Sequence, residues 1–320
     1  MTLPARWWSL EEGKADGDLS SRAGVLPREP SGQPHAASAI YYARCGLCVH
    51  ACRIAEGKWG YCGARNFSEG ALHSPFLGRF SSIAIDPIEK KPLYHWRPGS
   101  AIFSLGSLGC TMRCPFCQNH GIAHPAPEAE QRRLQEIAPE NLVALVRQKG
   151  LHAIAYTYNE PALQAEYILD AAPLLREAGI ATVLVSNGMY SDALLEELCP
   201  IVEAANIDLK TFNPDTYAKL GGSLETVKKT ISGLHAAGVH VEVTTLVVPG
   251  ISDSPEEFAE ELDWLATLSP DIPLHLSRYR PAYKYTAPPT DVSLLQHFAQ
   301  IAKDRIKHVH LGNVPGIHLR

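Results

Sequence analysis

The feature that most constrains this chain is a set of three closely spaced cysteines, Cys110, Cys114 and Cys117, in the stretch LGSLGCTMRCPFCQNH. They directly follow an apolar run at residues 101–105. A [4Fe–4S] cluster normally takes four cysteine ligands, and structural zinc takes four nitrogen or sulfur ligands, so three thiolates hold a metal centre without closing it. The intervening residues supply no fourth local ligand, which argues against a zinc knuckle or three buried thiols. The sequence therefore predicts a metal centre with one position open to an external molecule.

Length and composition are those of a soluble globular protein. A chain of 320 residues, 45% apolar and 20% charged, can bury one large core with room for a small accessory domain. The net charge of −5 gives no electrostatic reason to expect nucleic acid or an anionic membrane as a partner. No apolar run approaches the ~20 residues needed to span a bilayer. Since the N-terminus lacks the pattern of an export signal, the eight cysteines indicate a cytoplasmic location and metal binding rather than disulfides.

A second cysteine set lies nearer the N-terminus. Cys45, Cys48, Cys52 and Cys62 have the spacing C-x2-C-x3-C-x9-C, with glycines between them that let the backbone turn tightly. Four ligands would close the site, which gives it a structural or electron-relaying role. Zinc and a second iron–sulfur cluster both fit. The single compact set favours a closed structural site, and His50 is expected to be solvated rather than to replace a cysteine.

After the three-cysteine loop, apolar strand candidates alternate with amphipathic helical patterns, among them one that ends at Gly150. Such alternation predicts βαβ units and a parallel sheet. Ser191 and Ser254 stand at N-cap positions before two of the helical patterns. About six units without Gly-x-Gly-x-x-Gly favour an α/β fold of the partial (β/α)6 TIM-like barrel type over a Rossmann fold. The strand candidates are residues 101–105, 152–156, 181–185, 205–209, 239–248 and 273–276, with 307–311 as a seventh.

The chain is therefore expected to have three parts. Residues 1–40 lack apolar periodicity and are predicted to form an irregular arm, on which Trp7 and Trp8 could dock against the body. Residues 41–98 form a small Cys-rich metal-binding module, and residues 99–320 form the partial barrel.

Polar or turn residues follow nearly every predicted strand of the barrel. In barrels of this kind, reactive residues gather at the carboxyl ends of the strands. Strand-to-loop transitions also favour Asn, Gly and Asp for turn chemistry alone, but a complete ring of such residues indicates a site. The ring contains Asn159 and Glu160 after the second strand, Ser186 and Asn187 after the third, Asp208 and Lys210 after the fourth, and Pro249 after the fifth.

The C-x3-C-x2-C spacing, with an aromatic residue before the last cysteine, resembles the signature of the radical SAM enzymes. In that family the three cysteines ligate a [4Fe–4S] cluster whose fourth iron binds S-adenosylmethionine, and the fold is a partial barrel. The run CPFCQN resembles more narrowly the activating enzyme of pyruvate formate-lyase. Together with LCVHACRI, GYCGARNFSEGAL and DPIEKKPLYH, it is most similar to the radical SAM enzyme of the AmmeMemoRadiSam system.

The resemblance implies roles for the strand-end residues. Glu160 would accept from the amino group of S-adenosylmethionine, although Tyr158 and Asn159 replace the two glycines of the family's Gly-Gly-Glu element. Lys210 would offset the carboxylate of the cofactor. Ser186 and Asn187 match a Thr-Asn-Gly element of the family, in which the preceding acidic residue is replaced by Val185 here. Asp208 would orient Lys210 or bind a small cation. Pro249 would lie beside the adenine.

The function implied is reductive cleavage of S-adenosylmethionine to a 5′-deoxyadenosyl radical that abstracts hydrogen from a protein, peptide or small-molecule substrate. Cluster and cofactor carry this chemistry, so no general acid, base or nucleophile is expected from the chain. The family implies Memo-like and AMMECR-like partner proteins and an electron donor such as flavodoxin or ferredoxin. The alternative is a non-enzymatic iron–sulfur or zinc protein that relays electrons or scaffolds an assembly.

Overall fold

A mainly parallel eight-stranded sheet forms the body of the protein in a computed structural model that describes residues 3–13, 40–124 and 134–314. Its strands lie in the order β17-β16-β15-β14-β13-β12-β10-β9, so spatial neighbours are sequence neighbours. Only β9 runs antiparallel, against β10. The bounds are β9 Ser82–Pro87, β10 Ala101–Gly106, β12 Ala153–Tyr156, β13 Ala181–Ser186, β14 Ala204–Asp208, β15 His240–Val247, β16 Leu274–Arg278 and β17 Val309–Gly312.

All seven predicted strands are present and parallel to their neighbours, which confirms the predicted partial barrel. A doubly wound sheet would reverse its strand order part-way, and this order does not reverse. The strands are rich in apolar residues because both faces of such a sheet are covered, as the fully buried β12 shows.

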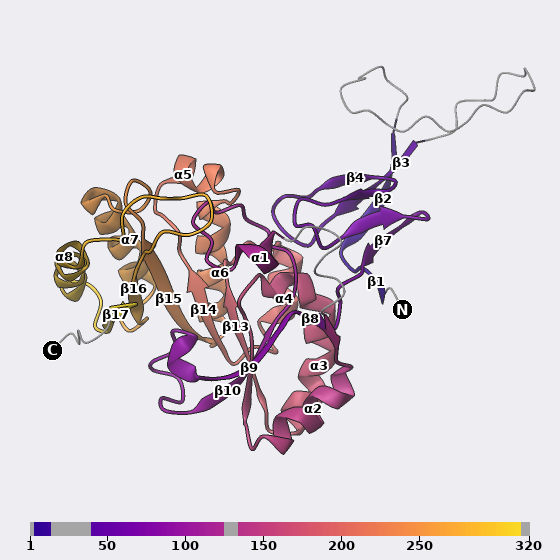
Figure 1. The fold of residues 1–320 in the computed structure, drawn as a ribbon, viewed down its shortest axis with the longest axis horizontal. Helices are drawn as coiled ribbons and strands as arrows, with labels where there is room; N and C mark the ends of the chain where they lie inside the picture. Colours follow the sequence, from indigo (N-terminus) through magenta and orange to yellow (C-terminus); the bar gives the residue numbers. More distant parts are fainter. Residues whose placement is uncertain (1–2, 14–39, 125–133, 315–320) are drawn as a thin grey trace, which may run out of the picture.

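Helices cover the outer face of the sheet (Figure 1). Most begin at a side chain that accepts from a backbone N–H, and the predicted caps Ser191 and Ser254 do so from Leu194 and Glu257. None of the helices in the described ranges has the length and apolarity to cross a membrane. The bounds are α1 His120–Ala123, α2 Pro139–Gln148, α3 Ala165–Glu177, α4 Asp192–Leu198, α5 Pro214–Lys219, α6 Leu224–Ala236, α7 Pro255–Leu268 and α8 Val292–Lys303, with 3₁₀ turns η1 Ile88–Lys90 and η3 Pro161–Gln164.

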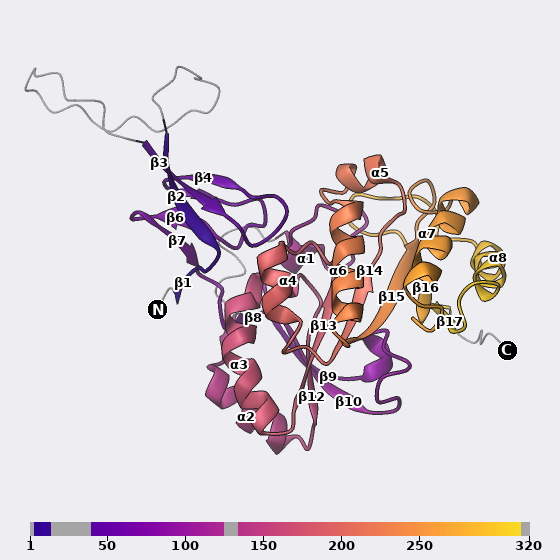
Figure 2. The ribbon, with the colours of Figure 1, turned by 180° about the vertical axis from the view of Figure 1, so that it is seen from behind.

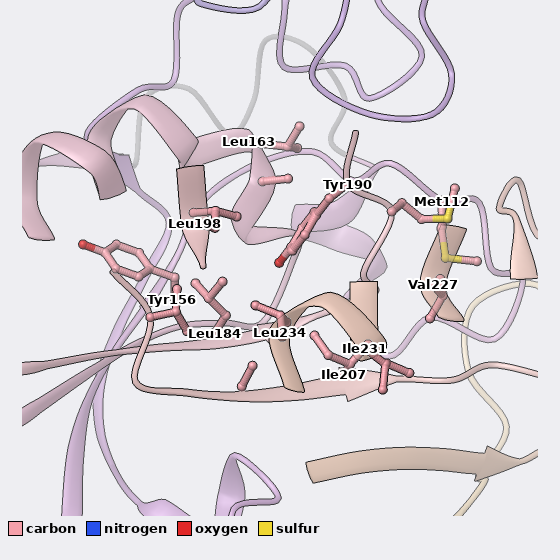
Figure 3. Packing of buried hydrophobic residues seen from close by; sticks show 14 of the residues in the cluster. Met112, Tyr156, Leu163, Leu184, Tyr190, Leu198, Ile207, Val227, Ile231 and Leu234 are labelled. Carbon is pink, nitrogen blue, oxygen red and sulfur yellow. The ribbon is translucent and has the colours of Figure 1, made fainter. Parts of the chain in front are cut away.

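The main core lies between the sheet and these helices (Figure 3). Leu198 of α4 and Leu234 of α6 are buried with Leu184 of β13 and Ile207 of β14. Met112, from the three-cysteine loop, belongs to the same buried cluster. The loop is therefore anchored in the hydrophobic core at one residue between its cysteines.

The N-terminal residues form a separate lobe of short antiparallel strands beside α1 and α4 (Figures 1 and 2). One sheet has the order β2-β3-β4 and the other β1-β7-β6-β5. A further short pair joins β8, which follows the lobe in sequence, to β11, which lies between β10 and β12. The bounds are β1 Leu3–Pro4, β2 Trp8–Gly13, β3 Ile40–Cys45, β4 Arg53–Ala55, β5 Lys58–Trp59, β6 Asn66–Ser68, β7 Ala71–Ser74, β8 Arg79–Phe80 and β11 Gln135–Glu136.

Two predicted boundaries differ from the structure. The irregular arm was expected over 1–40, but residues 8–13 form a strand that pairs with β3, a long-range partner that local periodicity does not reveal. Residues 14–39 lie outside the described residues. The module was expected over 41–98, but β9 belongs to the barrel sheet because it pairs along its whole length with β10. Trp7 docks as expected, since its Nε1 donates to Glu197 of α4 at 3.0 Å.

Candidate functional site

A cavity of about 360 Å³ opens where the three-cysteine loop meets the carboxyl ends of the strands. Its volume is within the ~300–1,000 Å³ typical of small-molecule sites. Cys110, Cys114 and Cys117, called the loop cysteines below, all line it. Five of the seven strand-end residues predicted from the sequence line it too, namely Asn159, Glu160, Asn187, Asp208 and Lys210.

The loop cysteines are surrounded by groups that favour thiolates bound to a metal. Cys110 Sγ accepts hydrogen bonds from the Met112 backbone N–H at 3.4 Å and from Asn187 Nδ2 at 3.5 Å. Burial raises the pKa of Cys114 to about 11, while Lys210 acts in the opposite direction. A buried thiol with such a pKa is protonated on its own, so ionisation requires a metal or another positive centre.

Glu160 is almost fully buried, with 1% of its surface exposed, at the end of β12. Its Oε1 accepts from Ala162 N–H at 3.0 Å and from Ser186 Oγ at 2.8 Å, and its Oε2 accepts from Asn187 N–H at 3.0 Å. Burial nevertheless raises its pKa to about 7, because desolvation outweighs these donors. A cationic ligand in the cavity would favour the ionised form.

Asp208 and Lys210 form an ion pair at the end of β14, with 2.8 Å between Oδ2 and Nζ. Burial opposes the charged form of Lys210, but the carboxylate of Asp208 outweighs it and raises the pKa of the ammonium group. The lysine is therefore a permanent positive charge beside the loop cysteines. It can offset an anionic group on a ligand.

Three of the predicted residues make hydrogen bonds to neighbouring parts of the protein, which gives them a supporting role at the site. Asn159 bridges the strand end to the loop, since its Oδ1 accepts from Ser107 N–H and its Nδ2 donates to the Gly109 carbonyl, both at 2.9 Å. Ser186 does not line the cavity and supports Glu160 instead. Pro249 does not line it either, and its carbonyl accepts from Tyr285 Oη at 2.7 Å.

Tyr158 is the main site residue that sequence reasoning missed. It lines the cavity with a φ of 71°, the left-handed conformation that favours glycine. Its hydroxyl donates to Asp86 of β9 at 2.5 Å, and the ammonium group of Lys91 lies 4.4 Å from its ring centroid. A Cβ at Gly106 would approach the Tyr158 ring to 2.9 Å. The sequence signal was the replacement of a family glycine, which marks a position where the backbone turns left-handed.

Further residues line the cavity besides these. Val185, at the position where the family has an acidic residue, presents an apolar side chain there. Without a carboxylate at that position, a cation site built on it has no ligand. The remaining lining residues include Lys90, Asn119, Asn206, Thr244, Leu246, Ser277 and Asn313.

Comparison with known proteins identifies the family. Residues 105–265 match the family model described as the radical SAM superfamily. The chain belongs to the radical SAM superfamily. The match begins at the end of β10, just before the loop cysteines, and ends within α7. It contains the loop cysteines, the four strands β12 to β15 and most of the residues that line the cavity.

Two relatives of this radical SAM chain differ in sequence identity and in how much of each chain the match covers. An uncharacterized protein of Methanocaldococcus jannaschii is 37% identical over 277 residues, which cover 85% of this chain and 82% of that protein. The pyruvate formate-lyase 1-activating enzyme of Escherichia coli K12 is 29% identical over 154 residues, 46% of this chain and 61% of that enzyme. The second match thus spans less than two thirds of the activating enzyme.

Among solved structures, the crystal structure of Streptococcus suis SuiB bound to S-adenosylmethionine has a TM-score of 0.51. It is 15% identical, and the alignment covers 66% of this chain and 51% of SuiB. At this identity the likeness concerns the fold alone.

Membership in the radical SAM superfamily implies a [4Fe–4S] cluster and S-adenosylmethionine, and the residues present fit both. Among the described residues, no three His, Cys, Asp or Glu side chains are placed to hold one metal ion. A cubane spreads its thiolates over several irons and therefore needs wider spacing than a single ion. The three thiols, the sulfur-directed N–H donors and the Asp208–Lys210 pair suit a cluster with an amino-acid ligand beside it.

Proposed function

We propose that this chain is the radical SAM enzyme of the AmmeMemoRadiSam system and that it resembles the pyruvate formate-lyase activating enzymes in its reaction. The observation that carries the proposal is the convergence of three thiols, a buried carboxyl and a partly buried ammonium on one cavity. These groups come from three separate strand ends. When bound, the cluster and S-adenosylmethionine supply the one-electron chemistry that allows hydrogen abstraction from a substrate.

The chain's own residues bind and orient the cofactor in this proposal. Glu160 accepts from the cofactor's amino group, and Lys210 offsets its carboxylate. Asp208 holds the lysine by the 2.8 Å ion pair. Val185 and Leu246 give the cavity an apolar wall for the adenosyl part. Glu160 and Cys114 are buried, whereas Cys110 and Cys117 are partly exposed, so a bound cofactor would shield the reacting atoms from water.

The substrate is proposed to be a protein, a peptide or a small molecule. Similarity to the activating enzymes favours a protein. By family alone, the proposed partners are a Memo-like and an AMMECR-like protein, with flavodoxin or ferredoxin as electron donor. The proposed location is the cytoplasm.

The test is anaerobic incubation of reconstituted protein with S-adenosylmethionine and dithionite, followed by chromatography for 5′-deoxyadenosine. We expect release by the wild type and none by Cys114→Ala. Cys199→Ser is the matched control, because this thiol follows α4, lies outside the cavity lining, and donates to the Gly233 carbonyl at 3.8 Å. No 5′-deoxyadenosine from wild-type protein with a full cluster would favour the non-enzymatic alternative.

A further inference from the structure

The cysteines of the N-terminal lobe are gathered in one place. Cys45, Cys48, Cys52 and Cys62, called the module cysteines below, lie within electrostatic range of one another. Three of them are buried, and the amide of Cys45 donates to the Cys52 carbonyl at 2.9 Å. The thiols of the module and of the barrel loop also share a local motif. In both sets the N–H two residues further on points to the sulfur, as for Cys62 and Cys110.

The arrangement of the module cysteines bears on which metal they bind. Zinc at about 2.3 Å from each thiolate requires sulfurs within roughly 3.8 Å of one another. In the described part of the chain no three such side chains meet the requirement for a single ion. The loop cysteines share this property, and they belong to a family whose cofactor is a [4Fe–4S] cluster. The module cysteines therefore resemble the loop cysteines in this respect, and that resemblance favours a cluster over a single zinc ion.

The two cysteine sets are joined directly. The backbone N–H of Cys110 donates to the carbonyl of Cys62 at 3.2 Å. A single hydrogen bond therefore links a ligand residue of one set to a ligand residue of the other. Gly109 makes the approach geometrically feasible, since a Cβ there would lie 2.6 Å from that carbonyl.

Further contacts hold the module against the loop. His50 is half-buried rather than fully solvated as expected, and its Nε2 donates to the Thr111 carbonyl at 2.7 Å, so that atom is not free to bind a metal. Arg113 hydrogen-bonds the Tyr61 carbonyl and lies over the Tyr61 ring, 4.3 Å from its centroid. The position of the module cysteines relative to the loop cysteines is thus held by side-chain contacts from both segments.

We propose that the module cysteines bind a second [4Fe–4S] cluster, which relays single electrons to the centre held by the loop cysteines. A low-potential flavoprotein or ferredoxin is oxidised by one electron, and the same electron passes through the module to the loop, with no other change of bonding. The relay role rests on the proposed function, whereas the metal assignment does not. This replaces the closed structural zinc site that the compact cysteine spacing alone favours.

Metal analysis of full-length protein, purified anaerobically, tests the assignment. In a variant with all three loop cysteines changed to Ala, any remaining iron belongs to the module. We expect about four irons and about four sulfides per chain, with the EPR signal of a reduced cubane after dithionite. One zinc, no metal, or about two irons would each overturn the assignment. This result does not depend on whether the protein cleaves S-adenosylmethionine.

A second variant keeps the proposal testable if the first is insoluble. Cys48→Ser in the otherwise unchanged chain should lower the iron content from about eight to about four, whereas the control Cys199→Ser keeps about eight. The EPR signal of the remaining loop cluster should also saturate at lower microwave power, because a neighbouring paramagnetic centre is gone. Unchanged iron content would contradict the second cluster, and unchanged saturation would contradict its position as a relay.

Discussion

At the scale of single residues, the site depends on a carboxyl and an ammonium group whose burial changes their chemistry. Glu160 is surrounded by three hydrogen-bond donors and still has a raised pKa. Lys210 has the opposite balance, because Asp208 holds it in its charged form. One residue therefore responds to pH near neutrality and the other does not.

Changing Lys210 to Ala is predicted to weaken S-adenosylmethionine binding and leave the cluster loaded. Loss of one charge-assisted contact costs ~1.5–3 kcal/mol, or about 10- to 150-fold in affinity. Calorimetric titration of the reconstituted variant measures this. Lys149→Ala, an exposed position after α2, is the control and should bind as the wild type does. Equal affinity in both variants would remove Lys210 from the binding site.

Binding of S-adenosylmethionine is also predicted to depend on pH through Glu160. Because its pKa is raised to about 7, the carboxyl is mostly protonated below that pH and mostly ionised above it. A cationic amino group binds the ionised form, so affinity should rise as pH increases from about 6 to 8. Titrations across this range should show the rise in the wild type and a flatter profile in Glu160→Gln. A parallel slope in both would mean that another group titrates.

At the scale of elements, the three-cysteine loop is fixed from two sides. The module holds it through Cys110 and Arg113, and the segment before α8 holds it where the Lys284 N–H donates to the Pro115 carbonyl at 2.9 Å. Gly109 is the position at which these contacts leave no room for a side chain.

The variant Gly109→Ala is predicted to separate the module from the loop. Both it and the control Gly179→Ala place alanine at a positive φ, +89° and +71°, which costs ~1–2 kcal/mol. At Gly179 a Cβ meets nothing within 4 Å, whereas at Gly109 it would lie 2.6 Å from the Cys62 carbonyl. Chemical denaturation should therefore show a larger loss for Gly109→Ala. Equal losses would mean that the loop shifts freely.

The sequence predicts elements well where burial is local and poorly where contacts are distant. The parallel strands are short segments rich in apolar residues, so each was found within about two residues. By contrast, β9 was placed in the wrong part because its partner β10 is separated from it by a 3₁₀ turn and a loop. For the site, residue type and order indicated Glu160 and Lys210. Nothing local indicated that Tyr158 would reach Asp86, 72 residues away.

At the scale of the whole molecule, a buried ion pair fastens the lobe to the barrel. Arg65 of the lobe pairs with Glu166 of α3, and their side chains are 1% and 5% exposed. The same carboxylate accepts from the Arg6 backbone N–H at 2.8 Å. Breaking one partner of a buried pair leaves an uncompensated charge, so this contact matters more than any surface pair.

Arg65→Met is accordingly predicted to lower the free energy of unfolding by about 3–5 kcal/mol. The control is Arg305→Met, which removes the more exposed pair with Asp263 and should cost at most ~1 kcal/mol. Thermal and urea unfolding followed by circular dichroism measure both. The double variant Arg65→Met with Glu166→Leu should recover part of the loss. No difference between Arg65→Met and its control would show that the lobe is held by other contacts.

The hydrogen bond from the Cys110 N–H to the Cys62 carbonyl joins two cysteine sets that are synthesised at different times. The ribosome adds roughly 5–20 residues per second, so all four cysteines of the lobe emerge several seconds before the three of the barrel loop. Under the proposed second cluster, iron delivered during translation can therefore reach the lobe cysteines before the loop cysteines exist. The order of the two sets along the chain would then also be the order in which they are loaded.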